Sequence, residues 1–280
     1  MCGMGRRHGG EQVRMTQINA ATMLCFVFVG LLVSCTKTPV QSEGLSPEVA
    51  MSGASRHELP KSRLWKSEVP LDGTISSTRD LMDRLTNEQR RIVTDFYDQF
   101  GTTVFEFATV NQLKWMLQHG YPTPDDILLA RSMTTEQLHL KFEAGDVKAG
   151  YFYLARQSAM GAESELSPRE VQELDDVART LLEAGSPFAG YSYFQYQMQA
   201  KGDPVSALAG LAWASTAGDS RAAMEMAEMS ELLERKQPRS VPAAALLFSY
   251  TALVNSISVE RPDLLTRRRE PYPYGDQPGR

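Results

Sequence analysis

A stretch of this sequence recurs 40 residues later, and this internal repeat restricts the possible folds more than any other feature. Glu-Ala-Gly at 143–145 precedes Ala-Gly-Tyr-x-Tyr at 149–153, and the same residues stand at 183–185 and 189–193, so seven positions match at identical spacing. A weaker copy begins with Ala-Gly-Asp at 217–219, and Lys-Gly-Asp-Pro at 201–204 carries the same turn. Repeats of about 30 to 45 residues with helical patterns are typical of stacked helix pairs, because one pair alone cannot bury its apolar face.

The residue types in the repeat fit a turn between two helices. Glycine ends the first helix because it adopts the left-handed conformation without strain. The Asp or Ser that follows it accepts hydrogen bonds from the free amides of the next helix. Small Ala and Gly residues four or five positions on allow two helices to approach closely. We therefore expect tightly packed helices over this region.

As a family pattern, Ala-Gly-Asp-Ser-Arg-Ala-Ala at 217–223 and its companions resemble SEL-like repeats, a branch of the tetratricopeptide group. The match covers roughly residues 134–235 and lacks the usual Gly-x-Gly turn between paired helices, so the repeat boundaries stay open. The resemblance implies an α-solenoid that binds other proteins.

Helix signals continue on the N-terminal side of the repeat and predict an all-α fold. A capping hydroxyl followed by Pro, or by Gln three residues on, marks the start of a helix. The segment 104–117 is ambiguous, since its apolar residues fit one helix ending at Gly120, while Phe-Glu-Phe at 105–107 alternates as in a strand; we favour the helix. The helix starts expected from caps are Thr86 with Gln89, Thr123 with Pro124 and Ser167 with Pro168, and Gly101 is an expected helix end.

An apolar run of 14 residues at 20–33 follows three arginines, Arg6, Arg7 and Arg14. It is shorter than the roughly 20 residues that a membrane-spanning helix needs. A basic start, a short apolar run and a small residue before the cut are typical of a secretory signal peptide. The sequence therefore predicts a cleaved signal peptide over 1–34, with a buried core helix or an uncleaved anchor as alternatives.

Leu-Val-Ser-Cys at 32–35 resembles the lipobox of bacterial lipoproteins. The resemblance implies cleavage before Cys35, lipidation of its thiol and acylation of its new amino group. The protein would then be held at the membrane by acyl chains on Cys35. Thr36 at the next position implies the outer membrane, with the protein facing the periplasm.

The rest of the chain divides by composition. A flexible tether rich in Ser, Pro, Gly and charge is expected over 35–76, an N-terminal helical region over 77–133, the SEL-like repeat region over 134–257 and a disordered tail over 258–280. The predicted fold class is thus an α-solenoid of stacked helix pairs behind a cleaved signal peptide and a flexible tether. The formal net charge is −5 and becomes more negative on cleavage, which argues against binding nucleic acid.

One motif suggests an enzyme. Glu163-Ser-Glu-Leu-Ser-Pro resembles the stretch around the catalytic acid of lytic transglycosylases, in which Glu163 would be the general acid toward peptidoglycan. Leu replaces the usual Phe, the later Gly-Leu-Met-Gln stretch is missing, and Ser167 with Pro168 is explained as a helix start. His57, His119 and His139 lie at no spacing typical of a helical zinc motif. We therefore predict no catalytic residue, no metal site and no cofactor.

Aromatic side chains in the repeat region are candidates for partner binding, since Tyr and Trp supply much of the energy of interfaces. We expect Tyr153, Tyr193, Tyr196 and Trp213 to line a concave groove, the alternative being that they pack between helices. The predicted function is a lipid-anchored scaffold for an unidentified envelope protein. The alternatives are a peptidoglycan-acting enzyme and a structural lipoprotein of a secretion or cell-wall assembly.

Overall fold

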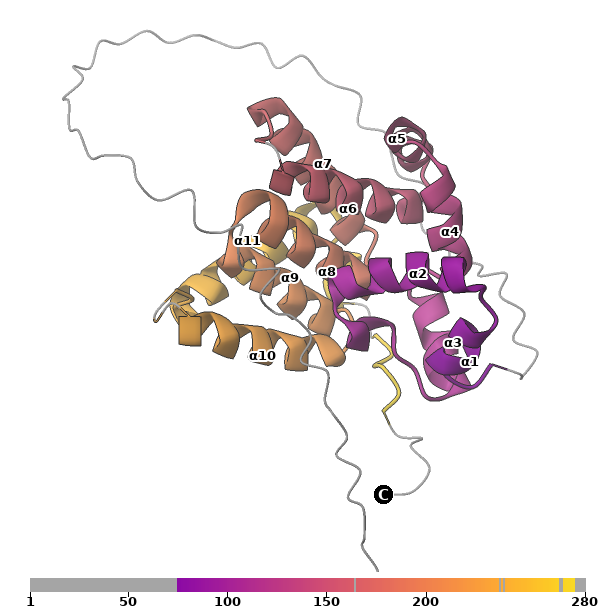
Figure 1. The fold of residues 1–280 in the computed structure, drawn as a ribbon. Coiled ribbons are helices and arrows are strands. Elements are labelled where there is room, and N and C mark those ends of the chain that lie inside the picture. Colours follow the sequence, from indigo (N-terminus) through magenta and orange to yellow (C-terminus); the bar gives the residue numbers. More distant parts are fainter. Residues whose placement is uncertain (1–74, 164, 237, 239, 267–268, 275–280) are drawn as a thin grey trace, which may run out of the picture. The chain divides into compact units, whose positions relative to one another are not determined.

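A computed structural model of the chain describes residues 75–274 except 164, 237, 239, 267 and 268, and all of these residues fall within one compact unit. This part of the chain is helical and contains no β-strand, which confirms the predicted all-α class (Figure 1). The predicted signal peptide over 1–34, and Cys35 with the rest of the predicted tether up to residue 74, lie outside the described residues. The elements are α1 (Thr78–Asp83), α2 (Asn87–Phe100), the 3-10 turn η1 (Thr102–Phe105), α3 (Val110–Gln118), α4 (Pro124–Ser132), α5 (Thr135–Glu143), α6 (Val147–Glu163), α7 (Pro168–Glu183), α8 (Pro187–Tyr196), the π-helical turn η2 (Gln197–Lys201), α9 (Pro204–Thr216), α10 (Arg221–Lys236), α11 (Ala243–Glu260) and α12 (Asp263–Thr266).

The helix starts expected from the sequence are confirmed. The Thr86 hydroxyl accepts a hydrogen bond from the amide of Gln89, whose side chain in turn accepts one from the Thr86 amide. Thr123 and Ser167 cap α4 and α7 by the same reciprocal arrangement, each followed by proline at the first helical position. Gly101 ends α2 with a positive φ of 87°. These ends are set by residues no more than four positions apart, which is why local sequence predicts them.

The single helix expected over 104–117 is wrong, and no strand forms there either. The chain instead makes the short turn η1 and starts α3 only at Val110, where the Thr109 hydroxyl accepts from the amide of Gln112. The break is stabilised by α1, because the Thr78 hydroxyl accepts a hydrogen bond from the Phe107 amide at 2.8 Å. Phe105 stacks against Tyr97 of α2 with ring centroids 4.0 Å apart.

The turn chemistry of the repeat is confirmed in each copy. The glycines at 145, 185 and 218 all have positive φ, with values of 94°, 81° and 114°. The residue after each glycine caps the next helix, since Asp146, Ser186 and Asp219 accept hydrogen bonds from amides two or three positions on. These three turns join α5 to α6, α7 to α8 and α9 to α10, so each copy of the repeat is one helix pair.

The most extensive contact between two of the described helices lies between α8 and α9 (Figure 1). Gly190 and Gly210 face each other there, and a Cβ added to Gly190 would lie only 2.4 Å from the Gly210 carbonyl oxygen. Around this contact, α9 also packs against α10 and α11, α6 packs against α5, α7 and α8, and α2 packs against α4 and α8. The largest fully buried side chains of this core include Trp213, Tyr121, Tyr151, Tyr191, Tyr196, Phe105 and Phe188.

The disordered tail expected over 258–280 is wrong for its described part. Helix α11 continues to Glu260, α12 follows, and Tyr272 is only 5% exposed. Residues 269–274 are non-helical, in keeping with Pro271 and Pro273, since proline cannot continue a helix. However, hydrogen bonds from side chains more than 150 positions away satisfy the carbonyl groups of Glu270 and Pro273. Such distant partners leave no local pattern in the sequence.

Candidate functional site

The four aromatic residues expected to line a groove lie between the helices of the chain itself. Tyr196, Trp213 and Tyr153 are 0%, 1% and 5% exposed, and Tyr193 is half-buried. The Tyr153 hydroxyl donates to Glu173, and the Tyr196 hydroxyl donates to Asp175 at 2.9 Å. These positions correspond to the alternative interpretation, in which the rings fill the space between helices.

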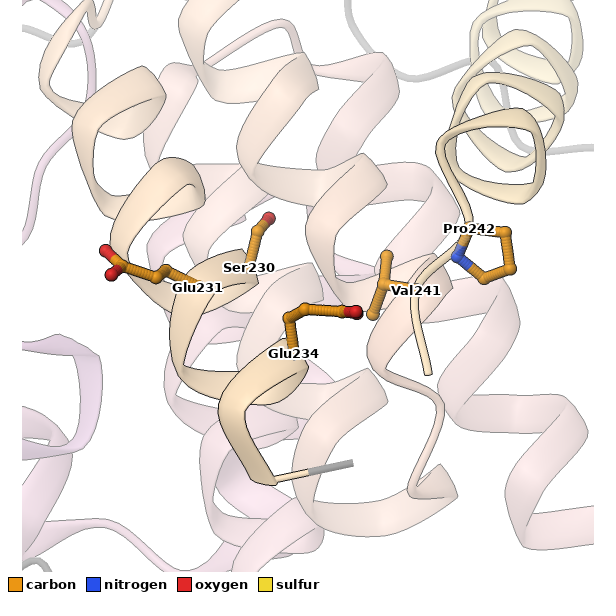
Figure 2. A pocket seen from close by; sticks show the side chains of 5 residues that line it. All are labelled: Ser230, Glu231, Glu234, Val241 and Pro242. Carbon is orange, nitrogen blue, oxygen red and sulfur yellow. The ribbon is translucent and has the colours of Figure 1, made fainter. Parts of the chain in front are cut away.

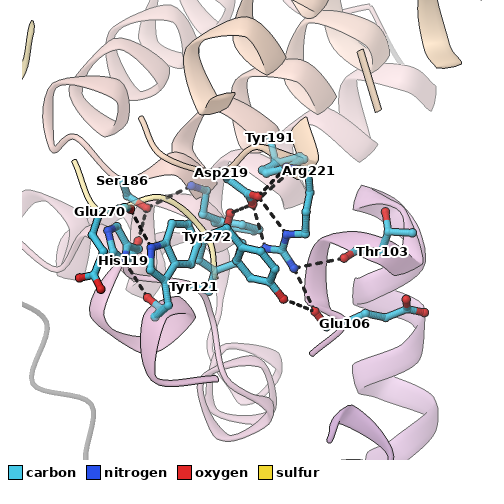
Figure 3. Close-up of polar contacts among 12 residues, drawn as sticks. Thr103, Glu106, His119, Tyr121, Ser186, Tyr191, Asp219, Arg221, Glu270 and Tyr272 are labelled. Atoms are coloured by element: carbon cyan, nitrogen blue, oxygen red, sulfur yellow. Dashed lines mark hydrogen bonds and ion pairs between the residues drawn. The ribbon is translucent and has the colours of Figure 1, made fainter. Parts of the chain in front are cut away.

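The polar centre of the described residues is instead a buried ion pair at the third repeat turn (Figure 3). The Asp219 carboxylate is fully buried and accepts two hydrogen bonds from Arg221, from Nε at 2.9 Å and from Nη2 at 2.8 Å. It also accepts hydrogen bonds from the hydroxyls of Tyr121 and Tyr191. A buried carboxylate needs such partners, because an unpaired charge inside a protein is strongly unfavourable.

Arg221 connects this turn to the η1 region. Its Nη1 donates to the carbonyl oxygens of Thr103 at 3.3 Å and Glu106 at 3.0 Å. Burial is the largest single effect and acts to lower the pKa of the Arg221 guanidinium, but the hydrogen bonds with Asp219 and the electrostatic effects of neighbouring groups together outweigh it and raise the pKa above its usual value. Arg221 is therefore charged near neutral pH, and its position is set by groups of the helical body.

A non-helical stretch of chain, Glu270–Tyr274, lies over this arginine, and we call it the C-terminal segment. The Tyr272 ring stacks on the guanidinium group, with the Arg221 carbon Cζ 3.9 Å from the ring centroid. The Tyr272 hydroxyl donates to the Glu106 carbonyl at 3.1 Å, and its amide donates to the Gly218 carbonyl at 2.9 Å. Cation–π contact and two hydrogen bonds thus hold one aromatic residue in place.

Two side chains of α3 hold the main chain of the C-terminal segment. Trp115 Nε1 donates to the Glu270 carbonyl at 2.9 Å, and Gln112 Nε2 donates to the Pro273 carbonyl at 3.0 Å. The Trp115 indole also meets the Tyr272 ring edge to face, with centroids 5.2 Å apart. We call the surface made by Glu106, Gln112, Trp115, Gly218 and Arg221 the segment groove. The hydrogen-bond donors and acceptors of the segment groove are placed to pair with the backbone groups of a non-helical peptide.

Both α3 donors are positioned by neighbours in the helical body. The side-chain oxygen Oε1 of Gln112 accepts a hydrogen bond from the Ala108 amide at 2.7 Å. This contact orients the side-chain nitrogen Nε2 of Gln112 toward the segment. The Trp115 ring stacks on His119 at 4.0 Å, and His119 Nδ1 donates to the Trp115 carbonyl at 2.7 Å. Burial lowers the pKa of His119, so this contact is one of a neutral imidazole near neutral pH.

A cavity of about 520 Å³ opens beside the segment groove, and Tyr272 and Tyr274 form part of its wall. Glu225 and Glu228 of α10 also line it. Burial, followed by the charge of Glu228, raises the pKa of Glu225 above its usual value. The cavity therefore extends the segment groove with an acidic and partly apolar surface.

A second cavity, of about 560 Å³, lies between the end of α10 and the start of α11 (Figure 2). Its polar side chains are already engaged, since the Ser230 hydroxyl donates to the Met226 carbonyl and Glu231 pairs with Arg235. The remaining lining groups are Glu234, Val241 and Pro242. No buried polar side chain converges there, so we regard the segment groove as the better candidate site.

Among the residues that the structure describes, no three His, Cys, Asp or Glu side chains lie close enough to hold a metal ion. His119 packs on Trp115, while His139 stacks on Tyr153 in a different part of the fold. Glu163 is the last residue of α6, and its side chain lies outside the described part.

Helix α11 exposes large apolar side chains. Leu247, Phe248 and Val259 are 65%, 78% and 79% exposed, although the opposite face of the helix packs against α9. Among the described helices it is the one long and apolar enough to cross a membrane, with a mean hydropathy of 1.3 over 18 residues. An apolar face of this kind is a common feature of interaction surfaces.

Comparisons with known protein families, curated proteins and solved structures find no match to this chain. Sequence reasoning identified the turn at 217–219 but missed both the Asp219–Arg221 pair and the groove that it supports. The alternation Pro-Tyr-Pro-Tyr at 271–274 was the one local signal, because proline and tyrosine are frequent in segments that bind as non-helical chain.

Proposed function

We propose that this protein is a lipid-anchored scaffold of the bacterial cell envelope that binds another protein through an α-solenoid of SEL-like helix pairs. The signal peptide over 1–34 would be removed, and acyl chains on Cys35 would hold the protein at the outer membrane, facing the periplasm. The tether over 35–76 would separate the helical body from the membrane surface.

The observation that carries this proposal is the repeated turn. Three helix pairs, α5–α6, α7–α8 and α9–α10, are joined by glycines of positive φ and capped by the next side chain. Repeat proteins of this kind use the extended surface of stacked pairs for binding. The Asp219 carboxylate, which is engaged by Arg221, and the apolar face of α11 favour a binding role over catalysis.

Crosslinking in intact cells tests the proposal. A photo-reactive residue at Phe248, which is 78% exposed on α11, should give one dominant adduct with an envelope protein. The matched control is the same residue at Glu88, on the exposed face of α2, which should not give that adduct. Changing Cys35→Ala should abolish the adduct, because the protein would no longer be held beside its partner. If none of the exposed positions of the helical body gave an adduct, the scaffold proposal would be contradicted.

Activity on peptidoglycan separates the scaffold from the enzyme alternative. We expect the purified protein to release no soluble fragments from peptidoglycan, and Glu163→Gln to leave partner crosslinking unchanged. Cleavage that Glu163→Gln abolishes would replace the scaffold proposal by that of a lytic enzyme.

A further inference from the structure

We infer that the segment groove is a peptide-binding site for a non-helical segment of another protein with tyrosine between two prolines, and that the C-terminal segment occupies this site as an exchangeable internal ligand. The inference rests on the proposed scaffold function and names a binding site and a ligand chemistry for it. Glu270–Tyr274 shows how such a ligand is held.

Most of the polar contacts use backbone groups of the segment. Its Glu270 and Pro273 carbonyls accept from Trp115 and Gln112, and the Tyr272 amide donates to the Gly218 carbonyl. Any chain of the same conformation offers these groups, so they supply affinity with little dependence on side chains.

Selectivity for tyrosine in the ligand comes from the contacts of the Tyr272 ring. Tyr272 lies on the guanidinium face of Arg221, meets the edge of Trp115 and donates its hydroxyl to Glu106. A phenylalanine would keep the stacking and lose the hydrogen bond. The flanking prolines have no amide to leave unsatisfied, and their fixed φ lowers the conformational entropy lost on binding. A Pro-Tyr-Pro segment is therefore the ligand that the groove fits best.

The groove is built without help from the segment. Arg221 is held by Asp219, Thr103 and Glu106, Gln112 by the Ala108 amide, and Trp115 by His119. None of these contacts involves the segment, so we expect the site to stay preorganised for a second occupant.

The glycine at 218 serves both the turn and the groove. Its φ of 114° suits glycine, and a Cβ at this position would lie 3.0 Å from the Glu270 carbonyl oxygen. The same absence of a side chain thus admits the backbone of the segment. This dual use explains why the segment crosses the protein at the third repeat turn.

A labelled peptide with the sequence of residues 268–275 tests the inference by fluorescence anisotropy, using the full chain. Covalent linkage gives the internal segment an effective concentration of about millimolar, so the unmodified chain should bind the peptide weakly. Tyr272→Ala removes the anchoring ring of the internal segment and should strengthen peptide binding at least about tenfold. The control Leu129→Ala alters a side chain of α4 that is 54% exposed and belongs to neither the segment nor the segment groove, and it should leave binding as weak as in the unmodified chain.

Two further arms address specificity and opening. A peptide with alanine in place of its central tyrosine should bind at least about tenfold more weakly, since a truncated anchor residue costs this much or more. In the unmodified chain, the Tyr272 amide should exchange with solvent faster than core amides such as that of Leu181, because the segment leaves the groove without global unfolding.

The inference would be overturned if folded Tyr272→Ala chain did not bind the peptide up to millimolar concentration. It would also be overturned if that variant did not fold, or if the Tyr272 amide exchanged only with global unfolding, since the segment would then be a permanent part of the core. Failure here leaves the scaffold proposal intact as long as crosslinking from α11 still captures a partner.

Discussion

Replacing Gly190 by alanine should destabilise the protein, because this residue sets the distance between α8 and α9. The added Cβ would lie 2.4 Å from the Gly210 carbonyl oxygen and 2.8 Å from the Ala214 amide nitrogen. Both are backbone atoms, so no side-chain rotation relieves the overlap. The two helices would have to separate by about 1 Å to restore ordinary contact in a close-packed interior.

The magnitude follows from two opposing effects. Overpacking a core costs about 1–3 kcal/mol, and a backbone overlap lies at the upper end of that range. Alanine is favoured over glycine within a helix by about 1 kcal/mol. We therefore expect the free energy of unfolding to fall by about 2 kcal/mol, which corresponds to a Tm lower by about 4–8 °C in a domain of this size. Urea unfolding and thermal melts followed by circular dichroism measure both quantities.

Gly161→Ala in α6 is the matched control. The three atoms nearest to its added Cβ all belong to the Leu166 side chain, the closest at 2.7 Å, and a half-buried side chain can shift more easily than a helix backbone. The control should be neutral or slightly stabilising, because it gains helix propensity without a backbone overlap. If Gly190→Ala were as stable as the control, the close contact between α8 and α9, and the role given to small residues in the repeat, would be refuted.

Three other predictions concern the buried pair, a carboxyl group and the anchor. Asp219→Ala should lower the free energy of unfolding by about 3–5 kcal/mol, because it leaves the Arg221 charge buried without its partner; an unchanged urea midpoint would contradict the network. Glu225→Gln should raise the Tm near pH 7, because a raised pKa means that the charged carboxylate costs the folded state stability above that pKa. The gain should disappear as the pH falls to about 4, where the carboxyl group is largely protonated in both states, and a gain independent of pH would argue against this cause. Cys35→Ala should yield a protein that keeps its signal peptide and gains no lipid, seen as a change in mass and in membrane fractionation; normal maturation and membrane retention would contradict the lipoprotein interpretation.

The sequence by itself determined the helical class and the main helix boundaries. Thr86, Thr123 and Ser167 cap helices through residues three positions away, and the repeat glycines close turns through φ values that other residues avoid. These interactions are local, so the identities of a few neighbouring residues are enough to predict them.

The tertiary structure alone decided which surfaces are available. An apolar period shows that the rings of Tyr153, Tyr196 and Trp213 lie on a buried face, but whether that face meets another helix or an open groove depends on how the helices dock. The break after η1 likewise depends on Thr78, 29 positions away from Phe107.

The segment groove is the clearest case of this limit. Trp115 meets the Glu270 carbonyl across 155 positions, and Arg221 meets the Thr103 carbonyl across 118. A proline-rich segment without a helical pattern of apolar residues is predicted to be disordered from its sequence, because no residue within it can satisfy its backbone hydrogen-bonding groups. Here those groups are satisfied by side chains that only the packing of the helices brings to the same place.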